Sequence, residues 1–127
     1  MNKAFIFLSM IFCHIIDDYY LQGVLANLKQ REWWKNNAPQ DIYANDYIMA
    51  LFMHSFSWSF MVMLPIAVSN KFNIGIRFIF LMAVNMLIHG YVDHMKANKR
   101  CINLIQDQSI HLLQIVITSL FWAFGLI

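Results

Sequence analysis

The segment IHGYVDHMK, residues 88–96, ends a long apolar run with two histidines, an aspartate and a lysine. The run covers residues 74–95, and about 20 apolar residues are enough for a helix to cross the hydrocarbon core of a bilayer. Ionisable side chains are costly inside a membrane, and those that occur there usually serve a function. The segment therefore predicts a membrane helix that carries a functional site at one end.

The composition also indicates a membrane protein. The chain has 127 residues, of which 60% are hydrophobic and 13% charged, and its mean hydropathy is +0.52. A soluble domain of this size cannot bury so much apolar surface. We expect an all-α fold, an integral membrane four-helix transmembrane bundle, and a single transmembrane domain over residues 1–127, because no internal repeat divides the chain. The predicted spans are residues 4–22, 47–68, 74–95 and 109–127.

Two long connections are predicted on the same side of the membrane. The first contains LANLKQREWWKNN, residues 25–37, which predicts a short interfacial helix with tryptophans at headgroup level. The second is predicted as a polar loop over residues 97–108. Together with Lys96, which immediately precedes the loop, they hold six of the nine basic residues, namely Lys29, Arg31, Lys35, Lys96, Lys99 and Arg100. Basic loops stay in the cytoplasm, so we expect the connections to be cytoplasmic and both termini to lie outside. The net charge of +2 is too small and scattered for nucleic-acid binding.

Three histidine–aspartate pairs share a spacing of four residues, and a lone histidine lies in the remaining span. A spacing of four places both members of a pair on one helix face. With alternating helices, all of these side chains fall in the half of the bundle nearest the long connections. They should point inward, because facing lipid would cost about 2.5–3.5 kcal/mol for each charged group. The predicted metal ligands are His14, Asp18, His54, His89, Asp93, Asp107 and His111.

Converging imidazoles and carboxylates favour a divalent metal ion. Histidine nitrogen and aspartate oxygen suit zinc best here, and Mn, Fe or Ni also bind such donors. Seven candidate ligands are enough for one ion or for two ions that share a carboxylate, an arrangement used to hydrolyse esters and phosphoesters. The alternative is that the pairs are hydrogen bonds that only hold the bundle together. Three pairs at one depth favour metal or proton chemistry.

Three further side chains are candidate catalytic residues. Lys96 lies three residues after Asp93. A lysine at this position usually extends to the headgroups as an anchor, and the alternative role is to meet an anionic substrate. Gln22 and Gln108 either support the ligands or are ordinary headgroup residues.

Three neighbours of the predicted ligands have other interpretations. Asn85, one turn from His89, either orients that imidazole or links two helices. Asp17 and His94 are each adjacent to a predicted ligand in sequence, so an α-helix would turn both of them to another face.

The order of four motifs resembles a family of small bacterial and phage inner-membrane proteins that is classed as a domain of unknown function. The motifs are HIIDDYYLQ, a lone histidine early in the second helix, HGYVDHMK and DQSIH. The resemblance covers nearly the whole chain and implies a multi-pass protein of the bacterial inner membrane. It implies a functional set of His14, Asp18, Gln22, His54, His89, Asp93, Lys96, Asp107, Gln108 and His111.

The resemblance has two departures. The family usually has a small residue at the position of Asp17, and the segment LANLK resembles a family stretch that ends in a lysine, with Lys29 displaced by one position. The family is itself distantly similar to proteins assigned as membrane-bound metal-dependent hydrolases. What the resemblance implies is a shared metal site, and it names no reaction.

Three functions remain open at this point. The first is a metal-dependent hydrolase of a phosphoester or other ester at the membrane surface, acting on a membrane lipid or a lipid-linked phosphate. The second is transport or binding of a divalent cation, for which four helices need a homo-oligomer to provide alternating access. The third is a non-enzymatic membrane protein with a structural metal.

Overall fold

The computed structural model describes residues 2–127, which are mostly helical and contain no β-strand. Of the single domain predicted over residues 1–127, residue 1 lies outside the described part. The elements are α1 (Lys3–Ile15), the π-helical turn η1 (Ile16–Leu21), α2 (Leu25–Leu28), α3 (Arg31–Asn37), the 3₁₀ turn η2 (Asp41–Tyr43), α4 (Asp46–Ser69), α5 (Ile76–His94), the π-helical turn η3 (Met95–Lys99) and α6 (Leu104–Ala123).

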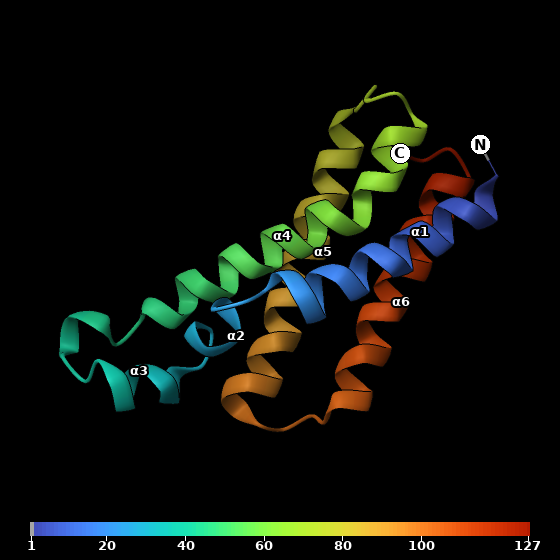
Figure 1. Cartoon of the computed structure of the whole chain (residues 1–127). Coiled ribbons are helices and arrows are strands. Elements are labelled where there is room, and N and C mark those ends of the chain that lie inside the picture. The colour runs from blue at the N-terminus through green and yellow to red at the C-terminus, as the bar shows by residue number, and fades with distance from the viewer. Residues whose placement is uncertain (1) are drawn as a thin grey trace.

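The four long helices pack against one another. Helix α4 contacts α1 and α5, and α6 contacts the same two helices from the other side (Figure 1). One end of the molecule, here called the termini end, holds both chain termini and the α4–α5 turn (Figure 1). Its parts are joined by hydrogen bonds from Lys3 Nζ to the Ala123 carbonyl (3.0 Å) and from Trp122 Nε1 to Asn70 Oδ1 (3.2 Å). The opposite, connector end holds α2, α3 and the link between α5 and α6.

Three helical segments are long and apolar enough to cross a membrane. They are Lys3–Leu21, Asp41–Ser69 and Ile76–Lys99, and they correspond to the first three predicted spans. Helix α6 has 20 residues but contains the polar run 106–108 near its start, and it is not among the three. These segments indicate a membrane protein.

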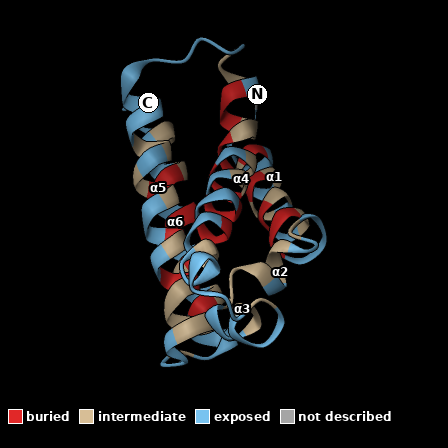
Figure 2. Ribbon diagram, turned by 90° about the vertical axis from the view of Figure 1, so that its left-hand side faces the viewer, coloured by how far each residue is buried: buried red, intermediate tan, exposed pale blue. Residues whose placement is uncertain are grey.

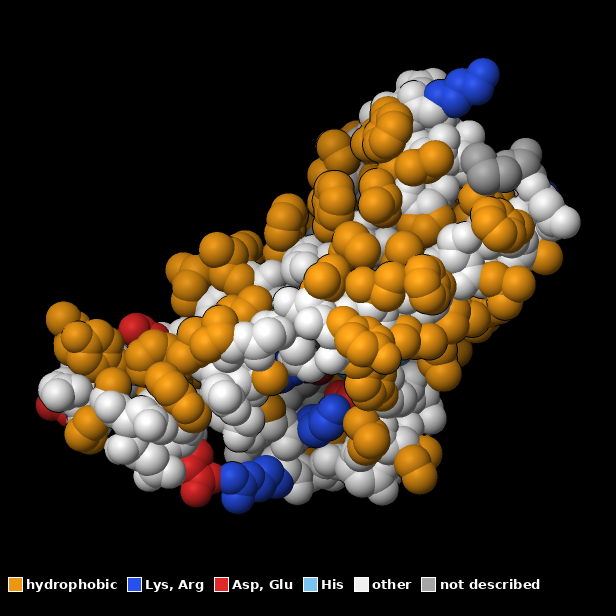
Figure 3. Space-filling model, viewed as in Figure 1, with side chains coloured by type: hydrophobic (Ala, Val, Ile, Leu, Met, Phe, Trp, Pro, Cys, Tyr) orange, Lys and Arg blue, Asp and Glu red, His pale blue; other side chains and the backbone are white. Residues whose placement is uncertain are grey.

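The outer surface is largely hydrophobic, whereas a compact apolar core lies toward the termini end. On the face drawn in Figure 3, hydrophobic side chains cover most of the surface and charged ones gather mainly at the connector end. Phe5, Leu113 and Ile79 are among the large apolar side chains that are at least half exposed. Figure 2 shows the buried residues along the inward faces of the helices. The core consists of Ile6, Met10, Trp58, Val62, Met63, Ile66, Ala67, Phe78 and Ile115.

Two predicted boundaries at the connector end are wrong. Helix α6 begins at Leu104, so the last part of the predicted loop over residues 97–108 is helical. The cause is a capping box, in which Asn103 Oδ1 accepts from the Gln106 N–H and the Gln106 side chain accepts from the Asn103 N–H. The interfacial helix predicted over residues 25–37 is two short helices, α2 and α3.

Helices α4 and α5 approach each other closely beside the predicted ligands. A Cβ atom added at Gly90 would lie 2.7 Å from Ser55 Oγ, which is too close for an unrelaxed contact. Glycine at this position therefore lets the two backbones come together, and it brings His54 on α4 within reach of His89 on α5.

Candidate metal centre

Six of the predicted ligands come together between the four long helices, at the half nearest the connector end. Their side chains arise from η1, α4, α5 and α6, so that no single helix makes the cluster. All six are buried, with an exposed fraction of 6% or less. They form two overlapping groups whose donor atoms are close enough to hold a metal ion, Asp18, His54, His89 and Asp93, and Asp18, Asp107 and His111.

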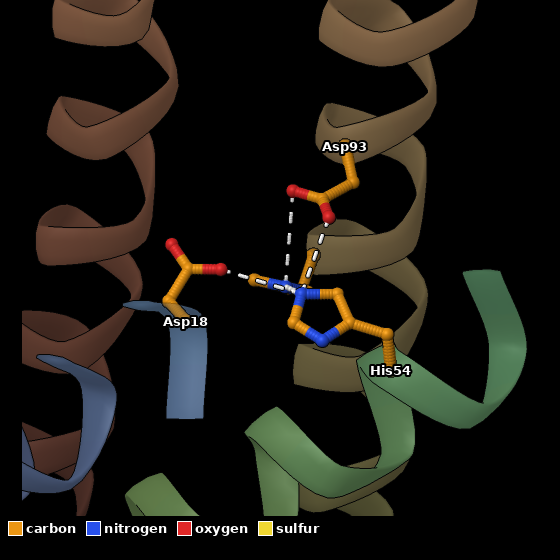
Figure 4. A group of neighbouring side chains, drawn as sticks. Asp18, His54 and Asp93 are labelled. Atoms are coloured by element: carbon orange, nitrogen blue, oxygen red, sulfur yellow. Dashed lines mark hydrogen bonds and ion pairs between the residues drawn. The ribbon is translucent and has the colours of Figure 1, made fainter. Parts of the chain in front are cut away.

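The first group surrounds one nitrogen of His54. His54 Nε2 lies 3.3 Å from Asp18 Oδ1 and 3.3 Å from Asp93 Oδ2, and Figure 4 shows both carboxylates directed at this imidazole from different helices. His54 Nε2 also lies 3.2 Å from His89 Nε2. A tetrahedron of ligands about 2.0–2.1 Å from a zinc ion has edges of about 3.3 Å. Three atoms at this spacing exceed what one N–H group can serve, and they match the ligand shell of a cation.

The second group contains two buried polar atoms that face each other without a hydrogen bond. His111 Nε2 lies 3.4 Å from Asp107 Oδ1 and 3.4 Å from Asp93 Oδ1. Within residues 2–127, neither His111 Nε2 nor Asp107 Oδ1 has a hydrogen-bond partner. A buried polar atom without a partner costs about 1–3 kcal/mol, and a cation between these atoms would remove that cost. Asp18 belongs to both groups, so its carboxylate could be shared by two ions.

The charges in and around the cluster also favour a cation. Four buried carboxylates are accompanied by two ammonium groups, which leaves two negative charges when the histidines are neutral. Unbalanced charge is strongly unfavourable in a protein interior, and one divalent cation would balance it. The carboxylates belong to Asp17, Asp18, Asp93 and Asp107, and the ammonium groups to Lys29 and Lys96.

The π-helical turn η1 explains why two consecutive aspartates are both buried. An α-helix would turn Asp17 away from Asp18, and the prediction that Asp17 lies on another face is wrong. The turn is widened, as the hydrogen bond from the Gln22 N–H to the Asp17 carbonyl shows (3.1 Å). Asp17 accepts a hydrogen bond from Ser57 Oγ (2.5 Å), and its Oδ2 lies 3.9 Å from His54 Nδ1. It therefore lies behind His54 and can orient that ring.

His14 is buried beside the cluster but lies outside both groups. Trp58 Nε1 donates a hydrogen bond to His14 Nδ1 (2.7 Å). The proton of the ring is then on Nε2, which donates to Gln108 Oε1 (3.0 Å). Trp58 also stacks on His89, with ring centroids 4.2 Å apart. In this arrangement both His14 nitrogens are in use, and the ring supports Gln108.

The three candidate catalytic residues differ in how they meet the carboxylates. Gln108 Nε2 donates to Asp18 Oδ2 (2.8 Å) and to Asp107 Oδ2 (3.0 Å), so it links two carboxylates. Lys96 Nζ donates to Asp107 Oδ2 at 2.8 Å and is 36% exposed. Gln22 donates to the Asp18 carbonyl, and its own Oε1 is buried without a partner within residues 2–127.

A second lysine reaches the cluster from the connector. Lys29 Nζ donates to Asp93 Oδ2 at 2.6 Å, and only 12% of its side chain is exposed. Sequence spacing alone gave no signal for this contact, because it depends on how the connector folds back. His94 lies outside both groups, where it stacks on Tyr47 and contacts Asn98.

Asn85 links helices, and none of its side-chain hydrogen bonds within residues 2–127 reaches the His89 side chain. Its Nδ2 donates to Thr118 Oγ1 (2.8 Å), and its carbonyl accepts from Gln114 Nε2 (3.1 Å). Gln114 Oε1 in turn lies 3.2 Å from His111 Nδ1. Gln114, rather than Asn85, can thus orient the His111 imidazole, and its position three residues after His111, on the same helix face, was the available signal.

Comparison of the chain with protein-family models, with curated proteins and with solved structures gives no match. The buried histidines and aspartates and their geometry are therefore what indicates the function of the chain.

Proposed function

We propose that the chain is a multi-pass membrane protein whose four long helices form a transmembrane bundle around a divalent cation. Helix α6 is the fourth span in this proposal. It packs between α1 and α5, and its outward side is apolar, with exposed Leu112, Leu113, Val116, Ile117 and Leu120. The connector end faces the cytoplasm of a bacterial inner membrane, because it carries most of the basic residues.

The observation that carries the cation site is the spacing of donor atoms around His54. Distances of 3.2–3.3 Å to two carboxylates and an imidazole suit a ligand shell and do not suit a set of hydrogen bonds from one N–H. Zinc is the preferred ion for this donor set, with Mn, Fe and Ni as alternatives. One divalent ion balances the charge of the cluster. A second ion at the Asp107 and His111 group, sharing Asp18, would be balanced by an anionic substrate.

Hydrolysis of a phosphoester or other ester at the membrane surface is the activity that this site supports best. A divalent cation polarises a phosphoryl oxygen and acidifies water. Among the residues of this chain, Lys96 is the partly exposed cation at the edge of the cluster, placed to attract an anionic substrate. Gln108 holds Asp18 and Asp107 in position. The substrate class in this proposal is a membrane lipid or a lipid-linked phosphate. The order of the four histidine and aspartate motifs supports membership of the family of inner-membrane proteins that the sequence resembles.

The deciding experiment uses the full chain purified in detergent. Metal content is measured by mass spectrometry for the wild type and for Lys96→Gln, with Lys99→Gln as the matched control, because Lys99 is exposed and contacts no carboxylate within residues 2–127. Phosphate release from phosphatidic acid is measured on the same samples. A hydrolase should retain its metal and lose activity in Lys96→Gln but not in Lys99→Gln. A wild type without metal would refute the proposal.

A structural metal is the second candidate, favoured by the complete burial of the donor atoms between helices. All three histidines of the two groups have an exposed fraction of 0%. A metal with only this role would stabilise the bundle without turnover. A metal-loaded wild type that releases no phosphate, and whose melting temperature falls when a chelator is added, would support this candidate over hydrolysis.

Cation transport fits the position of the cluster less well. His54 is about 12 Å from the start of α4 and about 22 Å from its end, whereas transport sites lie near the bilayer midplane. Zinc flux into proteoliposomes that contain the chain, as a homo-oligomer or otherwise, would favour transport instead.

A further inference from the structure

A second, polar cavity lies at the connector end, outside the cation cluster. It has a volume of about 410 Å³ and is bounded by α3 and by the residues of η3 and its C-terminal side. Ligand pockets commonly have volumes of about 300–1,000 Å³, so this cavity can hold a phosphate together with part of the molecule that carries it. None of the residues that line it belongs to either metal group.

The lining of this cavity is basic. Arg31, Lys35 and Arg100 contribute three positive charges, and Glu32 contributes one negative charge. Arg100 and Glu32 form an ion pair, so one basic side chain is already partnered. In the described part of the chain, no carboxylate lies within ion-pair distance of Arg31 or Lys35. Two uncompensated cations inside a concave site attract an anion.

Hydrogen bonds hold the two walls of the cavity together. Asn98 Oδ1 accepts from the Arg31 N–H (2.6 Å), and Asn98 Nδ2 donates to the Lys29 carbonyl (3.0 Å). A single side chain thus fastens the connector to η3. These two hydrogen bonds set the position of the start of α3 relative to η3, and so the distance between the two walls of the cavity.

Arg100 has a backbone conformation that is unusual for its residue type. Its φ of 54° is left-handed, at the position that ends η3, where the Cys101 N–H donates to the Met95 carbonyl (3.2 Å). Glycine is favoured at such a position, and another residue there costs about 1–2 kcal/mol. An arginine at this place is consistent with a role for its guanidinium group in the cavity.

The depth of the cavity matches that of lipid phosphates. Helix α3 carries Trp33 and Trp34, both half-buried, and tryptophans prefer the level of the headgroups. Arginine pairs with phosphate oxygens through two parallel hydrogen bonds, and lysine adds a point charge. We infer that the cavity bounded by Arg31, Lys35 and Arg100 binds a phosphate mono- or diester, either in the headgroup of an anionic lipid or as a free phosphate compound.

The test compares two double variants with the same loss of charge. Arg31→Gln/Lys35→Gln alters the cavity, and Lys71→Gln/Arg77→Gln removes two exposed cations at the termini end. Each full-length protein is treated with a chelator, so that metal-dependent hydrolysis cannot consume the lipid, and is placed in phosphatidylcholine nanodiscs that contain phosphatidic acid. The bound phosphatidic acid is then counted by native mass spectrometry. We expect the first variant to bind at least about tenfold less tightly than the wild type, and the second to be within about twofold.

Titration with inorganic phosphate in detergent separates the two sources of the phosphate group. Binding of the free anion at the same concentrations identifies a phosphate compound, whereas retention of the lipid alone identifies a headgroup site. Equal losses in the two double variants, or no retention by the wild type, would overturn the proposal. If the first double variant fails to fold, Lys35→Gln alone serves in its place, because Lys35 makes no side-chain hydrogen bond within residues 2–127. Metal content measured in parallel, on protein not treated with the chelator, is expected to be unchanged, so this proposal and the cation site can fail separately.

Discussion

The two halves of the helical bundle are held together by different interactions, although the same helices run through both. Toward the termini end, α4 contributes Val62, Met63 and Ile66 to an apolar core. Toward the connector end, the same helix contributes His54 to a polar cluster. In a membrane, apolar side chains gain little by leaving lipid for another helix, so apolar packing there depends on close fit. The polar half, in contrast, specifies which atoms must meet, and it is there that a function is expected.

Trp58 forms the boundary between the two halves. It is fully buried in the apolar core, yet its Nε1 donates to His14 and its ring lies against His89. One aromatic side chain therefore packs in the apolar core and also contacts two histidines of the polar half. If the two halves have these separate roles, variants in the polar half should alter cation binding, and variants in the apolar half should alter stability alone.

Asp93→Asn should have the largest effect. Asp93 touches His54, His111 and Lys29, and it is placed to bind a cation in the first group. Because loss of a residue that merely supports a ligand costs about 10–100-fold in metal affinity, loss of this carboxylate should cost more than about 100-fold. Isothermal titration with zinc measures the change. The matched control is Asp41→Asn, an exposed carboxylate that belongs to neither group.

The same substitution leaves a buried lysine without its partner, which can itself destabilise the fold. The double variant Asp93→Asn/Lys29→Gln removes both charges and keeps the test valid. Wild-type zinc affinity in a folded double variant would contradict the assignment of Asp93.

Ile66→Ala should destabilise the apolar half of the bundle. Ile66 is fully buried in the apolar core, and truncation of such a side chain costs about 2–5 kcal/mol of the free energy of unfolding. Denaturant unfolding in detergent measures the loss, and zinc affinity should stay within about twofold of the wild type. A large fall in zinc affinity would show that the two halves are not separable.

Asp17→Asn should produce a smaller change within the polar half. Asp17 Oδ2 lies 3.9 Å from His54 Nδ1, too far for a hydrogen bond, and Asp17 belongs to neither metal group. Its buried carboxylate, which accepts from Ser57, is placed to orient His54 through its charge. We expect zinc affinity to fall by about 10–100-fold, the range for supporting residues. Ser57→Ala keeps the carboxylate and should have a weaker effect, measured by the same titration. If Asp17→Asn binds zinc as tightly as the wild type, then Asp17 does not orient His54.

The sequence predicted the polar half where regular helical spacing applies. Pairs such as His89 and Asp93 are four residues apart, and this spacing placed both on one inward face. The lengths of the apolar runs located the first three spans to within a few residues. The exception is the start of the second segment, which begins at Asp41, whereas the predicted span begins at residue 47. The predicted start of the fourth span, residue 109, is wrong because the capping box of Asn103 and Gln106 begins α6 at Leu104, before the polar run 106–108.

The rest depended on irregular backbone and on tertiary folding. The prediction that Asp17 lies on another face assumes the 3.6-residue period of an α-helix. It is wrong because this period fails in the π-helical turn η1. Lys29 reaches Asp93 only because the connector folds back, and no local pattern encodes that return. Trp58 lies in a largely apolar stretch of α4, and nothing in the neighbouring sequence marks its hydrogen bond to His14.

The smallest expected effect concerns the contact that sets the distance between α4 and α5. In Gly90→Ala the new Cβ would lie 2.7 Å from Ser55 Oγ, whose rotamer is held by a hydrogen bond to the Leu51 carbonyl (2.6 Å). Alanine favours a helix interior by about 0.5–1 kcal/mol over glycine, but crowding costs about 1–3 kcal/mol, so we expect a net destabilisation of about 1 kcal/mol.

Ser55→Ala removes the oxygen that causes the crowding, and the remaining Cβ would be 3.5 Å from the new methyl group, an ordinary contact. The double variant Gly90→Ala/Ser55→Ala should therefore regain stability, and a double-mutant cycle in denaturant should show a coupling of about 1 kcal/mol. Zinc affinity should fall in Gly90→Ala and recover in the double variant, because the helix separation sets the 3.2 Å distance between His54 and His89. If stability recovers and zinc affinity does not, the spacing of the backbones does not control the cation site, and the polar half is positioned by its own hydrogen bonds.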